Sequence, residues 1–174
     1  MEKHIFWEII EKSLLVSAEE QETEIQKLLV NFSLADIVQF EIILRELIIE
    51  LDDYKVMGIL KIIDSYVSDD SYLYFRWWLI SRGKKIFDIA LENPDNIAVF
   101  VDNSTFPDFE SLLYVADNAY MQKSGAAEDD ENLPREIAYS KGLDYDFGAP
   151  PTKGTDWKEE DLPRLYPALW KIYN

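Results

Sequence analysis

The stretch that decides the fold is Val67-Ser68-Asp69-Asp70-Ser71-Tyr72-Leu73-Tyr74-Phe75-Arg76-Trp77-Trp78-Leu79-Ile80-Ser81-Arg82-Gly83. Capping residues and acids come first, apolar residues recur at helical spacing, and a glycine ends the stretch, which is typical of an α-helix. At about 100° per residue, Arg76 lies in the middle of the apolar arc. Tyr74 and Ser81 lie on the opposite side, which we expect to face water.

Arg76 needs a partner, because an unpaired charge in an apolar arc costs on the order of several kcal/mol. Helical positions place Asp69 on the same side of its own helix, and Glu110 and Asp117 on one flank of a later helix. We therefore predict that Arg76 pairs with Glu110, Asp117 or Asp69. One interpretation is a buried ion pair that fixes helix register. The other is a polar pocket formed by Asp69, Asp70, Arg76, Glu110 and Asp117, although two acids in a first turn also suit the helix dipole.

The rest of the chain has the same helical character. Apolar periodicity and caps predict helices over residues 5–14, 18–29, 33–51, 53–66, 84–92, 107–123 and 157–173. Ile97–Val101 is the one candidate strand, and a short helical turn fits it as well. We expect an all-α fold, a single helical domain over 1–174 with a bundle of about seven to eight helices.

Residues 126–155 differ from the rest, because they are rich in proline and glycine and carry an acidic run. We predict a long irregular acidic loop here, before the C-terminal helix. Acids and aromatic residues on such a loop are candidate partner contacts. The alternative is a charged loop that is simply solvated. The candidate contacts are Glu128, Asp129, Asp130, Glu131, Tyr139, Asp144, Tyr145, Asp146 and Phe147.

The composition excludes several classes of function. The 174 residues include 34 acidic and 17 basic side chains, a formal charge of −17. This charge argues against direct nucleic-acid binding and against binding to anionic membranes. The chain has no cysteine and one histidine, His4, which excludes disulfides, zinc–thiolate sites and histidine-rich metal sites. We predict no catalytic residues, no metal and no cofactor, and the question of enzymatic activity stays open.

The location of the protein is a further expectation. No apolar stretch approaches the roughly 20 residues that a membrane-spanning helix needs. Glu8 and Glu11 interrupt the first apolar run, so the N-terminal residues do not fit a signal peptide. We therefore expect a cytoplasmic protein. Its oligomeric state is left open.

The quoted stretch resembles a known family. Ser68-Asp69-Asp70, Tyr74-Phe75-Arg76, Trp78-Leu79-Ile80 and Gly83 are similar to the signature of the bacterial domain-of-unknown-function family numbered 4240. The similarity extends to residues 6–10, 87–94, 110–120 and 157–169. Val67 and Ser71 differ, since the family tends to have cysteine and glycine there. The resemblance implies a bacterial cytosolic protein, and it carries no established activity and no catalytic residues.

Three functions are consistent with these features. The first is a binding protein that engages a basic protein through an acidic surface, with an immunity protein as the concrete version. The second is a small-ligand sensor or a carboxylate-based enzyme that uses a polar pocket around Arg76. The third is a nucleic-acid mimic or regulator, which differs from the first only in its partner. We favour the first.

Overall fold

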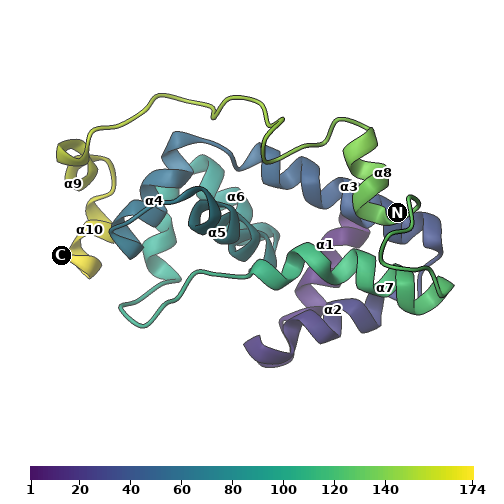
Figure 1. Ribbon diagram of the computed structural model, residues 1–174. Helices are drawn as coiled ribbons and strands as arrows, with labels where there is room; N and C mark the ends of the chain where they lie inside the picture. Colours follow the sequence, from purple (N-terminus) through teal and green to yellow (C-terminus); the bar gives the residue numbers. More distant parts are fainter. The chain divides into compact units, whose positions relative to one another are not determined.

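The computed structural model describes residues 1–174 and is helical throughout, which confirms the all-α class (Figure 1). It contains ten α-helices and four short 3-10 helices, more than the seven to eight predicted, because short helices follow residue 133. The chain divides into two compact units. Unit 1 comprises Met1–Ile49 and Ser111–Pro150, and unit 2 comprises Glu50–Glu110 and Pro151–Asn174. The expectation of one domain over the whole chain stays a prediction.

Unit 1 is built around α3, a 17-residue helix that is apolar on most of its surface. Phe40 of α3 contacts Phe6 of α1, with ring centroids 4.6 Å apart. α7 runs alongside α2, and α8 packs on α7 (Figure 1). The elements of unit 1 are α1 (Lys3–Ser13), η1 (Ala18–Glu20), α2 (Gln21–Leu29), α3 (Leu34–Glu50, whose last residue belongs to unit 2), most of η3 (Glu110–Tyr114), α7 (Val115–Ser124) and α8 (Pro134–Ser140).

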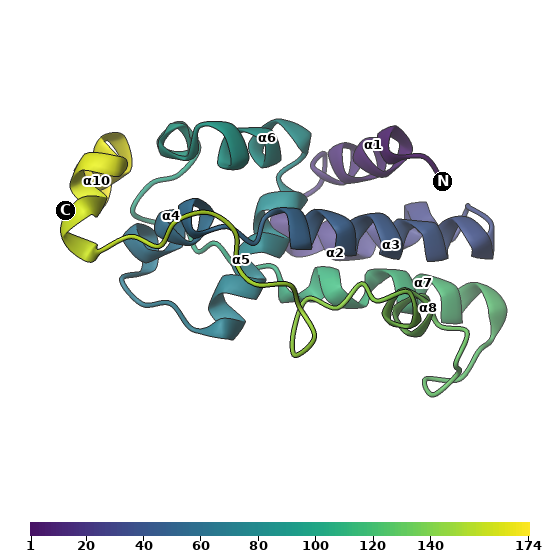
Figure 2. The ribbon, with the colours of Figure 1, turned by 90° about the horizontal axis from the view of Figure 1, so that it is seen from above.

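Unit 2 places α5 among α4 and α6, and α10 lies against α4 and η2 (Figure 2). Asp95 ties η2 to α10, because its carboxylate accepts hydrogen bonds from the Ala168 and Leu169 amides at 3.0 Å. This contact satisfies backbone donors at the start of α10. The elements are α4 (Tyr54–Asp64), α5 (Asp69–Ser81), α6 (Lys84–Glu92), η2 (Pro94–Val99), η4 (Glu159–Asp161), α9 (Leu162–Leu165) and α10 (Pro167–Tyr173).

Several predicted boundaries hold because their caps form. Ser17 and Glu20 make a capping box, and the Ser33 and Ser68 side chains accept hydrogen bonds from the amides of Asp36 and Ser71. Ser81 is fully buried rather than exposed, because its hydroxyl donates to the Trp78 carbonyl oxygen at 2.8 Å and α5 is packed on nearly all sides.

The open alternative at Ile97–Val101 is decided for the short helical turn, since η2 covers its first part. Two other expectations need correction. The helix predicted over 107–123 begins only at Glu110, as η3, because the Asp108 side chain accepts a hydrogen bond from the Glu110 amide and forms a local turn. The segment 126–155 is not wholly irregular, since it contains α8.

Gly58 of α4 has no room for a side chain. A Cβ there would lie 2.5 Å from the Tyr166 Oη and 2.8 Å from its Cζ. Tyr166 is buried and donates to the Lys55 carbonyl oxygen at 2.7 Å, so the ring cannot move away without losing this hydrogen bond.

We expect Gly58→Ala to destabilise the protein by about 1–2 kcal/mol, because overpacking outweighs the gain in helix propensity. Urea denaturation measures the change. The same substitution in a Tyr166→Phe background should cost less, since the nearest atom is gone. A Gly58→Ala protein more stable than wild type would contradict the packing.

Candidate functional site

Arg76 is buried on α5, as its place in the apolar arc predicts. Its side chain is about 6% exposed, and its Nη1 lies 3.8 Å from the Asp52 Oδ2. The guanidinium also lies over the Tyr72 ring, 4.5 Å from the centroid, which is a cation–π distance. Asp52 was not among the three acids predicted from helical positions, because it belongs to the turn between α3 and α4.

Tyr72 fixes the same turn. Its hydroxyl lies within hydrogen-bonding distance of the Leu51 and Asp53 carbonyl oxygens, at 3.1 and 3.0 Å, and it accepts a hydrogen bond from the Asp53 amide at 3.0 Å. Burial raises the pKa of Tyr72, and nearby Arg76 opposes the rise. The neutral phenol and the guanidinium together hold residues 51–53 against α5.

The other acids of the predicted pocket lie in different surroundings. Asp69 and Asp70 are exposed in the first turn of α5, where acids favour the helix dipole, and Glu110 is exposed at the start of η3. Asp117 is buried and serves an arginine as predicted, but this arginine is Arg135.

A buried ion pair that sequence reasoning missed lies at the centre of unit 1. Glu41 and Arg45 are one turn apart on α3, about 1% and 3% exposed, and their Oε1 and Nε are 2.7 Å apart. Their spacing of four residues within an otherwise apolar helix is the signal that could have revealed the pair. Burial raises the pKa of Glu41, and Arg45 opposes this rise.

Arg45 also reaches the acidic loop. Its Nη1 donates to the Leu143 carbonyl oxygen at 3.0 Å, and its guanidinium lies 4.9 Å from the centroid of the Tyr145 ring. Burial raises the pKa of Tyr145 to about 12. α3 therefore holds residues 143–145 through one side chain.

Asp117 and Arg135 join α7 to α8 beside this pair. The Asp117 Oδ1 accepts a hydrogen bond from the Arg135 amide at 3.0 Å, and its Oδ2 lies 3.2 Å from the Arg135 Nε. Burial raises the pKa of Asp117, against the effect of these contacts. The start of α8 is thus fixed by a carboxylate from α7.

The predicted partner contacts fall into two groups. Tyr145 packs under the Arg45 guanidinium. The Asp144 carboxylate accepts hydrogen bonds from the Asp146 and Gly148 amides at 2.9 and 2.7 Å. The Asp130 carboxylate accepts hydrogen bonds from the backbone and side-chain nitrogens of Asn132. These three side chains shape the loop. The remaining contacts are exposed: Glu128, Asp129, Glu131, Tyr139, Asp146 and Phe147.

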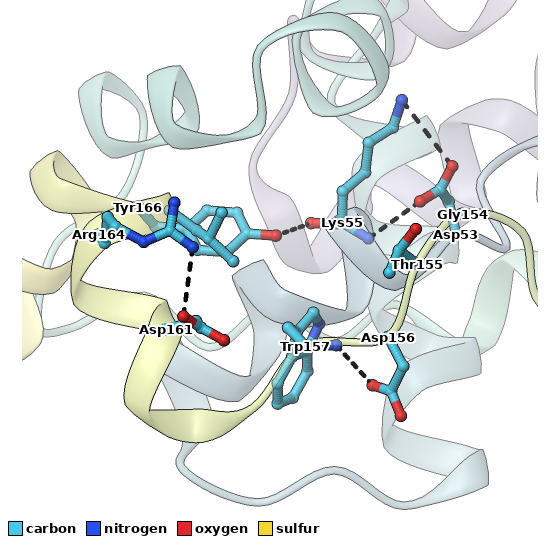
Figure 3. Close-up of a pocket in the computed structure, with 10 residues that line it drawn as sticks. Asp53, Lys55, Gly154, Thr155, Asp156, Trp157, Asp161, Arg164 and Tyr166 are labelled. Carbon is cyan, nitrogen blue, oxygen red and sulfur yellow. Dashed lines mark hydrogen bonds and ion pairs between the residues drawn. The ribbon is translucent and has the colours of Figure 1, made fainter.

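Unit 2 contains a separate pocket of about 480 Å³ (Figure 3). It lies where residues 153–157 run beside the start of α4, joined by backbone hydrogen bonds between Lys153 and the residues Asp52 and Tyr54, at 3.0 Å. Its lining residues are Asp53, Lys55, Gly154, Thr155, Asp156, Trp157, Asp161, Arg164, Leu165 and Tyr166. Sequence reasoning did not identify this pocket, because it depends on the packing of two distant segments.

Two further structural facts bear on function. No group of three or more His, Asp or Glu side chains in residues 1–174 is arranged to hold a metal ion. No helix combines the length and the apolar character that crossing a membrane requires.

We expect Arg45→Leu to lower the free energy of unfolding by about 3–5 kcal/mol, because it leaves Glu41 buried without its counter-charge. The double variant Glu41→Leu/Arg45→Leu should recover most of this loss. Urea denaturation of both variants tests the pair. A single variant that costs less than about 1 kcal/mol, or a double variant no better than the single one, would show that the ion pair matters little.

The raised pKa of Glu41 predicts a pH dependence. The folded protein retains the Glu41 proton above the ordinary glutamate pKa of 4.5, where the unfolded chain releases it. Wild type should therefore lose stability relative to Glu41→Gln as the pH rises from this value through the folded pKa. Urea denaturation across this pH range measures the difference. The opposite trend would mean that attraction to Arg45 outweighs burial.

The comparisons with known proteins agree with the resemblance in the sequence. The chain matches the family described as "Protein of unknown function (DUF4240)" over residues 1–122. The matched region ends before α8 and before the similar residues at 157–169. No curated protein and no solved structure matches the chain. On the family match, the chain belongs to the DUF4240 family.

Proposed function

We propose that this protein binds a basic protein in the cytoplasm through the exposed part of residues 128–148, here called the acidic segment. The observation that carries the proposal is Phe147. Its side chain is fully exposed, and the loop that carries it is held by the Arg45 contact with Leu143 and by the Asp144 carboxylate, which accepts hydrogen bonds from the Asp146 and Gly148 amides. An exposed aromatic residue on a pre-ordered loop is a typical anchor of a protein interface, because little entropy is lost on binding.

The charge around this anchor supports a basic partner. Residues 128–148 as a whole contain seven acids and two bases. Arg135 is engaged with Asp117, so Lys141 is the exposed base. The exposed acids are Glu128, Asp129, Glu131, Glu136 and Asp146. Such a field accelerates association with a cationic surface and weakens with added salt.

The other candidate functions have less support. Arg76 is buried beneath Asp52 and Tyr72, so no observation favours a ligand site around it. A nucleic-acid mimic would use the same acidic surface, and an immunity protein is one form of the proposed function. The identity of the partner separates these two.

We expect Phe147→Ser to leave stability within about 0.5 kcal/mol of wild type, because the side chain is exposed. Partner affinity should fall by about tenfold or more, as for an interface hot spot. Immobilised wild type and variant are compared for basic proteins captured from the native host. Isothermal titration calorimetry then measures the affinity for the protein identified.

Leu15→Ser is the matched control, because Leu15 is another strongly exposed apolar residue of unit 1, outside the acidic segment. It should retain the partner. Equal capture by the Phe147 and Leu15 variants, or capture that high salt does not weaken, would contradict the proposal.

A further inference from the structure

The unit 2 pocket contains an aromatic ring held in place by its own hydrogen bond. The Trp157 Nε1 donates to the Tyr54 carbonyl oxygen at 2.7 Å, which fixes the indole against the start of α4. Figure 3 draws this ring below Lys55, between the Asp161–Arg164 pair and Asp156. The ring is therefore positioned before any ligand arrives, which lowers the entropic cost of binding.

The backbone beside the ring is equally fixed. Gly154 has a φ of +83°, and a Cβ there would lie 2.6 Å from the Asp53 Oδ1. Asp53 in turn accepts a hydrogen bond from the Lys55 amide at the start of α4. Residues 153–157 thus lie close against α4, and the pocket has a defined wall.

The charges of the pocket leave one carboxylate in excess. Three acids and two bases line it, a net charge of −1. Lys55 is 3.8 Å from the Asp53 carboxylate, and Arg164 is 3.2 Å from that of Asp161. Asp156 forms no ion pair, and its Oδ1 accepts a hydrogen bond from the Trp157 amide at 2.8 Å. Its second oxygen can accept a hydrogen bond from a ligand.

We propose that this pocket binds an organic cation with N–H donors, of the guanidinium type. The indole of Trp157 is the best aromatic partner for such a cation, and the neighbouring Asp156 carboxylate supplies the opposite charge. The net charge of −17 adds an attractive field for any cation. An anionic ligand is disfavoured, because both basic side chains of the pocket already face carboxylates. The inference stands apart from the function proposed for unit 1.

The test is a titration with N-acetyl-arginine amide in which NMR spectroscopy monitors the indole N–H resonance of Trp157. Trp157→Phe assigns this resonance. The uncharged isostere N-acetyl-citrulline amide is the control ligand, and it should leave the resonance in place. Asp156→Asn should weaken binding by up to about fivefold, the upper end for an exposed charge pair. Asp64→Asn removes the same charge from an exposed site at the end of α4 that does not line the pocket, and it should have less effect.

Free arginine distinguishes two sources of the cation. Its α-ammonium group adds a second positive charge near the excess carboxylate, so binding tighter than that of the blocked form supports a free amino acid as the ligand. Equal or weaker binding supports an arginine side chain of a protein. Equal shifts with arginine and citrulline probes, equal weakening by the two Asn variants, or a Trp157 shift with inorganic phosphate alone would overturn the proposal.

Discussion

The buried guanidinium of Arg45, paired with Glu41, is the constraint that determines where residues 143–145 lie in unit 1. Two charges on a helix that is otherwise apolar lose their hydration, and the pair alone does not satisfy every donor of the guanidinium. The remaining contacts of Arg45 go to the Leu143 carbonyl oxygen and the Tyr145 ring. The hydrogen-bond donors of one buried side chain therefore hold on α3 a loop that lies almost a hundred residues away in the sequence.

Unit 2 repeats this solution with different residues. Arg76 lies on an apolar helix, over a tyrosine ring and near a carboxylate, and it holds the turn at residues 51–53. That turn carries Asp53, which caps α4 and leaves room only for glycine at position 154. Both arginines thus serve as supports. The surfaces available for binding are the segments that they position: the loop with Phe147 in unit 1 and the wall of the Trp157 pocket in unit 2.

The sequence predicts the helices and caps because these depend on neighbours within a few residues. It also predicts that Arg76 and Asp117 point inward, since periodicity places them in apolar arcs. It does not identify Asp52 and Arg135 as their partners. Asp52 lies in a turn and Arg135 in a short helix, and helical periodicity does not predict which distant elements pack together. The ion pair of Glu41 and Arg45 could have been predicted, since the two residues are only four positions apart on one helix. The Trp157 pocket could not have been predicted, because it forms only where residues 153–157 lie against the start of α4.

Arg45 orders the loop that carries Phe147 by holding residues 143–145 on α3. Backbone ¹⁵N relaxation of residues 143–148 tests this role, in wild type and in a Glu41→Met/Arg45→Met variant that removes both charges together. We expect order parameters of about 0.85 in wild type, as in rigid backbone, and values below about 0.6 in the variant, while the amides of α3 stay rigid in both. A loop equally mobile in the two proteins, or equally rigid in them, would contradict this role of Arg45.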